Sequence, residues 1–192
     1  MLLIIPFPHQ VVVISCRIMP IGETSLPEFD QEMTNTRKIL ECVPEDAYFY
    51  QPHEKSMTLI RLASHVADLP NWVVETMHKE KLELMPGQAP YIAKSNAELM
   101  AAFDKNSAAC AAIEGANDED FGAPWSFIYA GHTMFTMPRA AVLRSVVINH
   151  LIHHRAQLGV YLRMNNIAIP GMYGPSADDK SAMFAAADST TA

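Results

Sequence analysis

Cysteine is scarce in this chain, and the few cysteines lie far apart. The 192 residues contain three of them, Cys16, Cys42 and Cys110. Their odd number and wide spacing exclude a disulfide framework and a CxxC metal pair. Because disulfides are rare where the cell keeps thiols reduced, the pattern favours a cytoplasmic protein.

Basic residues are also few, and they do not cluster. The chain has 14 Lys and Arg against 21 Asp and Glu, a net charge of -7. Proteins that bind nucleic acid neutralise its phosphates with clustered Lys and Arg. We therefore expect no nucleic-acid partner.

Apolar runs long enough to cross a membrane are missing too. The most apolar stretch, MLLIIPFPHQVVVISC, is interrupted by Pro6 and Pro8, and it is shorter than the roughly 20 residues that a span needs. It lacks the basic start of a signal peptide. VISC resembles a lipoprotein cleavage site, but no Lys or Arg precedes it. We expect no membrane association, and we interpret this stretch as an extension upstream of a start at Met19, or as an edge segment on the body.

Strand signals are weak along the chain, whereas four segments have the periodicity and end signals of helices. In the first segment Ser25 and Glu28 form a capping box, with Pro27 in the first turn. In the second, Pro70 should introduce a kink. We expect helices over residues 25–42, 56–78, 95–114 and 138–164.

Long helices without strong strands predict an all-α fold, and a four-helix bundle is the simplest such arrangement. Residues 117–137, before the fourth helix, are rich in aromatic and β-branched side chains. We expect them to form a long ordered loop, or a short hairpin that turns at YAGH. The chain after Asn166 contains prolines and glycines that predict irregular structure, and its end should be mobile.

The fourth helical segment contains three histidines in NHLIHHRAQLGVYLR. His150 and His154 fall on an apolar stripe with Leu143, Val147, Leu158 and Tyr161, which places them at core positions one turn apart. Such a pair can be two hydrogen-bonded core residues, or it can bind one metal ion as zinc-binding helices do. His153 points about 100° away from His154 and cannot easily share that ion.

A third imidazole is available in the second helical segment, LIRLASHVADL. His65 lies among Leu62, Val66 and Leu69 there, so it can face inward. Three neutral imidazoles would suit Zn²⁺, Ni²⁺ or Fe²⁺ and leave coordination positions open. Asp68 follows His65 closely and could orient its imidazole as a hydrogen-bond acceptor, or could simply be a solvated helix residue.

At these motifs the chain resembles the DinB-like (YfiT-like) family of metal-binding proteins. HLIHHRAQ is similar to the family's HxxHHRGQ, with Ala156 where glycine is common, and LASHVADLPNWV also resembles members of the family. The resemblance covers about residues 25–179. It implies a four-helix bundle there, an N-terminal extension over residues 1–24 and a mobile tail over residues 180–192.

The resemblance also implies a function and a set of site residues. His65, His150 and His154 would be ligands of a divalent ion, most simply zinc. Arg155 would form a structural ion pair or contact the substrate, and we favour the ion pair. The expected protein is a cytoplasmic homodimer and a metal-dependent enzyme, acting on a small molecule as a hydrolase or as a transferase that uses a low-molecular-weight thiol. No residue pattern identifies a general base. The alternative is a stress-associated protein that binds a metal or ligand without catalysis.

Overall fold

The computed structural model describes residues 2–7, 10–15 and 19–179. Near the N-terminus, β1 (Leu2–Phe7) and β2 (Gln10–Ser15) pair with each other as antiparallel strands. The predicted tail over residues 180–192 lies outside the described residues. Within the described ranges, no helix combines the length and the apolar character that a membrane span requires.

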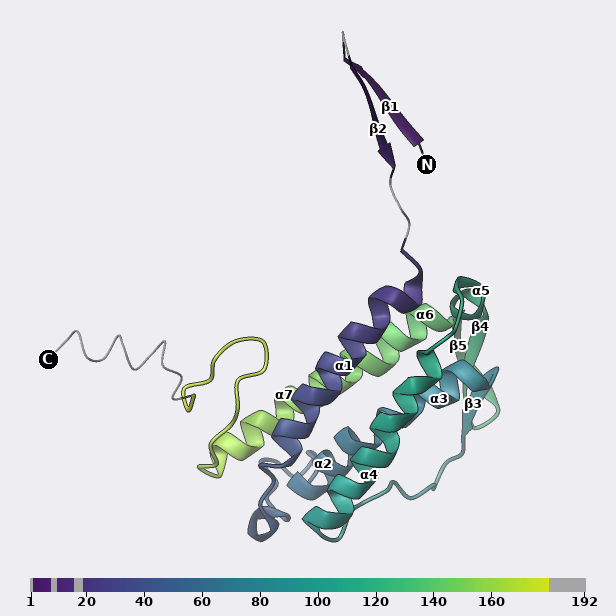
Figure 1. Ribbon diagram of the computed structural model, residues 1–192. Coiled ribbons are helices and arrows are strands. Elements are labelled where there is room, and N and C mark those ends of the chain that lie inside the picture. The colour runs from purple at the N-terminus through teal and green to yellow at the C-terminus, as the bar shows by residue number, and fades with distance from the viewer. Residues whose placement is uncertain (1, 8–9, 16–18, 180–192) are drawn as a thin grey trace, which may run out of the picture.

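The body of the protein is mostly helical, and its long helices lie side by side (Figure 1). Helix α1 contacts α2, α4 and α7, and α2 also contacts α4 and α7. The α-helices are α1 (Ile21–Leu40), α2 (Leu59–Asp68), α3 (Asn71–His78), α4 (Asn96–Ala108), α5 (Asp118–Gly122), α6 (Arg139–Val142) and α7 (Asn149–Met164). The 3₁₀ segments η1 (Glu45–Ala47) and η2 (Ala109–Ile113) follow α1 and α4.

Helix α1 begins at Ile21, earlier than the expected start at Ser25. The cap comes from a distant part of the chain: the Asp118 carboxylate accepts a hydrogen bond from the Ile21 backbone N–H at 2.8 Å. This contact satisfies one of the amides that a helix N-terminus leaves free. The expected start was wrong because a local capping pattern does not reveal a cap that is supplied by another segment.

The second predicted helix is divided at Pro70, as its sequence predicts. Pro70 is the N-cap of α3, and the backbone N–H groups of Trp72 and Val73 bond to the carbonyls of Leu69 and Pro70. The third predicted helix appears as α4 followed by η2, and the Ser95 hydroxyl accepts the backbone N–H of Glu98 at 3.2 Å. The break at Pro70 separates α2, which bears His65, from α3.

The all-α expectation is confirmed only in part, because the mostly helical fold also includes a three-stranded sheet. Strands β4 (Pro124–Tyr129) and β5 (His132–Pro138) form the hairpin, and its turn places Ala130 and Gly131 at positive φ. Strand β3 (Lys81–Leu84) adds to β4 in parallel, so the order is β3-β4-β5. Four residues are too few for a clear sequence pattern, and the partner of β3 is distant in the chain.

The fourth helix contains a π-helical segment, η3 (Leu143–Ile148), between α6 and α7. A π turn holds an extra residue and therefore changes the helical phase of everything after it. The fully buried stripe is Leu143, Val147, Leu151, Arg155, Leu158 and Leu162. The predicted stripe is confirmed at Leu143, Val147 and Leu158. It is wrong at the two histidines, because His150 and His154 lie at the edge of the core and are half-buried.

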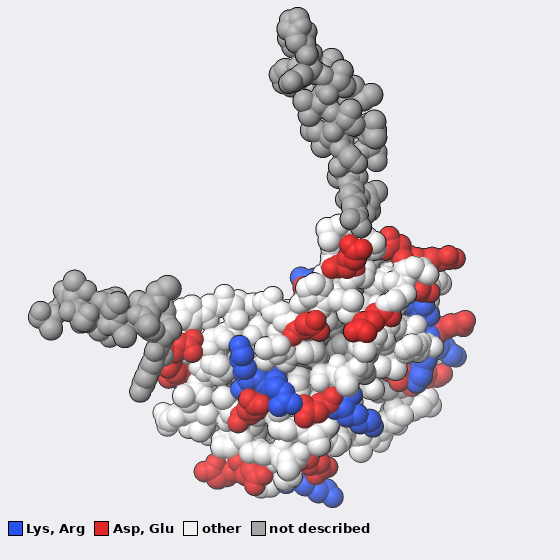
Figure 2. Space-filling view, in the orientation of Figure 1, with Lys and Arg blue, Asp and Glu red and all other residues white. Residues whose placement is uncertain are grey.

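Two clusters of buried side chains form the core. One joins α2, α4 and α7 through residues such as Leu62, Phe103 and Leu158. The other lies near the sheet and includes Phe29 and Phe121. Figure 2 shows acidic and basic side chains mixed over the visible face, with the basic ones in small groups beside acidic ones. The core thus holds α2 against α7, the two helices that bear the histidines.

Candidate metal centre

The imidazoles of His65, His150 and His154 converge where α2 packs against α7. One ring nitrogen of each lies within 4.8 Å of the others. The distance between the Nε2 atoms of His65 and His150 is 3.3 Å. The ring centroids of His65 and His154, and of His150 and His154, are 4.7 Å apart. The structure therefore brings together the three histidines that the sequence singled out.

Partial burial and mutual proximity keep these imidazoles neutral. Burial lowers the pKa of His65 from 6.5 to about 4, helped by the nearby His154, His150 and Arg61. Burial also lowers the pKa of His150 and of His154. At neutral pH each ring therefore keeps one nitrogen with a free lone pair, which is the form that binds metal ions.

Hydrogen bonds determine which nitrogen of each α7 histidine is free. The side-chain oxygen of Gln157 accepts a hydrogen bond from Nδ1–H of His154 at 2.8 Å. The backbone carbonyl of Val146 accepts one from the His150 ring, whose Nε2 faces His65. Such partners set the tautomer and the orientation of metal-binding histidines. Sequence reasoning missed this role of Gln157, although its position three residues after His154 places it on the same face.

The donor set fits a divalent transition metal ion. Two nitrogens bound at about 2.0–2.1 Å to one tetrahedral ion are about 3.3–3.4 Å apart, and the two Nε2 atoms of His65 and His150 have this separation. Among the described residues, the group of metal-binding side chains has these three members and no fourth. Three imidazoles without a thiolate or carboxylate suit zinc, nickel or ferrous iron.

The other candidate residues are placed less centrally. Asp68 accepts a hydrogen bond from the Asn106 amide at 3.3 Å, and burial raises its pKa; within the described part, its expected bond to His65 does not occur. His153 is exposed, with its ring 4.9 Å from that of His154. Arg155 is buried and forms an ion pair with Glu32 at 2.6 Å, as expected of a structural residue.

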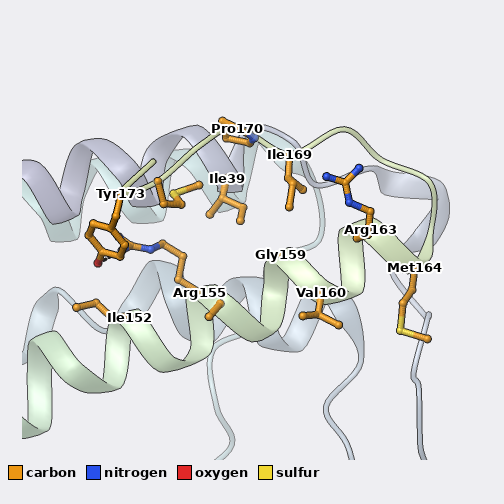
Figure 3. A pocket seen from close by; sticks show the side chains of 12 residues that line it. Ile39, Ile152, Arg155, Gly159, Val160, Arg163, Met164, Ile169, Pro170 and Tyr173 are labelled. Atoms are coloured by element: carbon orange, nitrogen blue, oxygen red, sulfur yellow. Dashed lines mark hydrogen bonds between the residues drawn. The ribbon is translucent and has the colours of Figure 1, made fainter. Parts of the chain in front are cut away.

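Two cavities lie in this part of the fold. A cavity of about 240 Å³ opens beside the metal centre and is lined by Met57, Arg61, His65, Asp68, Pro90 and Tyr91. A larger apolar cavity of about 400 Å³ lies on another face of α7, where Arg155, Gly159 and Arg163 line it (Figure 3). Its walls are α7, Ile39 of α1 and the segment from Ile169 to Tyr173. The smaller cavity gives a ligand access to His65.

A model of the DinB family matches residues 19–184. The chain belongs to the DinB family. This confirms the resemblance seen in the histidine motifs, and the match includes all three converging histidines of this DinB protein.

Two solved DinB-like proteins share the fold. One, from Bacillus cereus, is 22% identical with a TM-score of 0.63, and the match covers 80% of this chain and 98% of that protein. The other, from Bacillus subtilis, is 20% identical with a TM-score of 0.59, covering 78% and 96%. At these identities the likeness establishes the fold and nothing further. No curated protein matches this DinB family member.

Proposed function

We propose that this protein is a metal-dependent enzyme that acts on a small molecule, as a thiol-dependent transferase or as a hydrolase. The observation that carries the proposal is the convergence of His65, His150 and His154, three neutral imidazoles from two helices. A structural zinc site is closed by four protein ligands, whereas a catalytic site has three and an open position. The described residues supply three.

The residues of the chain would hold the ion and orient its ligands. His65, His150 and His154 would bind a divalent ion, most simply zinc, while Gln157 and the Val146 carbonyl hold the two α7 rings in place. When bound, such an ion supplies Lewis acidity that lowers the pKa of a coordinated thiol or water. The cavity beside His65 would admit the substrate.

We also propose a homodimer of four-helix bundles, located in the cytoplasm. The bundle helices would be α1, α2 with α3, α4, and α6 with α7. Helix α7 exposes the apolar side chains of Val160 and Met164, which are 57% and 59% exposed. An apolar surface of this kind supports self-association. Light scattering at micromolar concentration tests it, and a mass near that of one 21.3 kDa chain would contradict it.

The experiment that tests the enzyme proposal begins with protein purified without a His-tag or nickel resin. Mass spectrometry should find about one divalent ion per chain. The loaded protein should then transfer low-molecular-weight thiols to electrophilic substrates, or hydrolyse small esters or amides, in a screen against His154→Ala. Metal binding without turnover in either screen would support the non-catalytic alternative instead.

A further inference from the structure

Helix α2 presents three polar side chains to the cavity beside the metal centre. Arg61, His65 and Asp68 are spaced by four and three residues, so they lie on one face of the helix. All three line the 240 Å³ cavity, together with Met57, Pro90 and Tyr91. Arg61 therefore shares the wall of this cavity with one of the proposed metal ligands.

The guanidinium group of Arg61 is exposed and is free of partners among the described residues. It has no hydrogen bond or ion pair with any residue that the structure describes, although it lies close enough to lower the pKa of His65. Every other arginine of the described chain has a partner. Four of them pair with carboxylates, and the fifth, Arg139, donates to backbone carbonyls; the pairs are Arg37–Glu41, Arg144–Glu28, Arg155–Glu32 and Arg163–Asp178.

The charges at this cavity select one class of anion. A guanidinium group matches the two oxygens of a carboxylate with two parallel N–H donors. A phosphate dianion would require more positive charge than one arginine supplies. The Asp68 side chain on the same wall would repel any anion, but it would repel a dianion more strongly than a monoanionic carboxylate. A monoanionic carboxylate is thus the group that this cavity suits best.

We infer that Arg61 binds a carboxylate of the substrate, or of the thiol co-substrate, beside His65, His150 and His154. The inference rests on the proposed function, because it requires a small molecule in an open coordination position. Arg61 would act as a substrate-binding and specificity-determining residue, since it selects molecules whose carboxylate reaches α2 when their thiol or reacting group reaches the three histidines.

The test uses the whole protein loaded with Co²⁺, whose absorption spectrum changes when a thiolate binds. It is titrated with 3-mercaptopropionate and with 3-mercapto-1-propanol, which differ in the carboxylate. Arg61→Gln should weaken 3-mercaptopropionate about fivefold and leave 3-mercapto-1-propanol unchanged. The difference between wild type and Arg61→Gln in affinity for 3-mercaptopropionate should shrink as the salt concentration is raised, because Arg61 is exposed. Arg61→Lys should retain only part of the preference for 3-mercaptopropionate over 3-mercapto-1-propanol.

Arg144→Gln is the matched control. It removes the same charge from an exposed arginine that does not line the cavity, so both affinities should match the wild type. Equal ratios of the two affinities in wild type and Arg61→Gln would overturn the inference, and so would an equal loss for both thiols with lower cobalt content. If neither thiol alters the cobalt spectrum of the wild type, no thiol binds the ion, and the inference fails together with the thiol-transferase form of the proposed function.

Discussion

On one face of α7, His150 and His154 are half-buried and neutral, and their ring nitrogens meet that of His65. On another face of the same helix Arg155 is 2% exposed and charged. Its guanidinium donates to the Glu32 carbonyl and to the Thr36 hydroxyl at 3.0 Å each, and to the Tyr173 hydroxyl at 2.5 Å. Figure 3 shows the Arg155 side chain directed toward the ring of Tyr173.

The two faces differ in what their polar groups do. The polar groups around Arg155 hold segments of the fold together, whereas the histidines are placed to bind a ligand. The Arg155 guanidinium is committed to α1 and to the segment after α7, and the Glu32 carboxylate also accepts the Tyr173 hydroxyl at 2.9 Å. On the histidine face, the three imidazoles lie close to one another, and hydrogen bonds to Gln157 and to the Val146 carbonyl orient two of the rings. Three imidazole nitrogens held this close together could bind one metal ion.

The largest effect should come from removing the buried ion pair between Arg155 and Glu32. Arg155→Met leaves the buried Glu32 carboxylate without its counter-ion, which should lower the free energy of unfolding by about 3–5 kcal/mol. Urea denaturation of metal-free protein measures this. Adding Glu32→Gln to Arg155→Met should restore part of the loss. Metal content of the folded fraction should stay near the wild-type level, and a parallel loss of metal would show that the two faces are coupled.

The next effect concerns the histidine face itself. His154→Ala should weaken metal affinity by more than about 100-fold, whereas His153→Ala should largely spare it. Both variants remove an imidazole from adjacent positions of one helix, and only the orientation differs. Mass spectrometry of protein purified identically, with helicity checked by circular dichroism, compares them. Equal metal retention in the two variants would remove His154 from the site.

A smaller change should follow from loosening His154 without removing it. Gln157→Ala deletes the acceptor for Nδ1–H of His154, so metal affinity should fall about 10- to 100-fold. Competition with a chromophoric chelator measures the affinity. Gln157→Glu keeps an oxygen acceptor and serves as the control. An affinity that is unaffected by Gln157→Ala would mean that packing alone orients the imidazole.

The smallest effect is the pH dependence of the metal-free protein. The pKa of His65 is about 4 in the folded state and near 6.5 when unfolded, so protonation favours the unfolded state. The stabilising contribution of the neutral ring is complete above about pH 6.5 and is lost as the pH falls toward 4. Allowing for solvent screening, unfolding at pH 5 should require about 1 kcal/mol less than at pH 7.5. His65→Gln should reduce this difference, and an unchanged pH profile would show that His65 is not shielded from water.

Local sequence patterns predicted the helices well and the sheet poorly. The break at Pro70 and the turn at Ala130 and Gly131 are short-range features of the chain, and both appear in the structure. Strand β3 is recognisable only through its pairing with β4, and the start of α1 depends on the Asp118 cap. Contacts between segments that are far apart in the chain cannot be predicted from a local sequence pattern.

The sequence by itself determined that His150 and His154 share one side of a helix, because a spacing of four residues sets their relative direction wherever the helix lies. The HxxHH motif likewise indicated the DinB family, which the family comparison confirms. Only the tertiary structure decided that His65 meets them, that η3 shifts the buried stripe onto Arg155, and that Arg61 lies without a partner beside the same site. Helical spacing orients side chains within one element, whereas burial and convergence depend on how α1, α2 and α7 pack against one another.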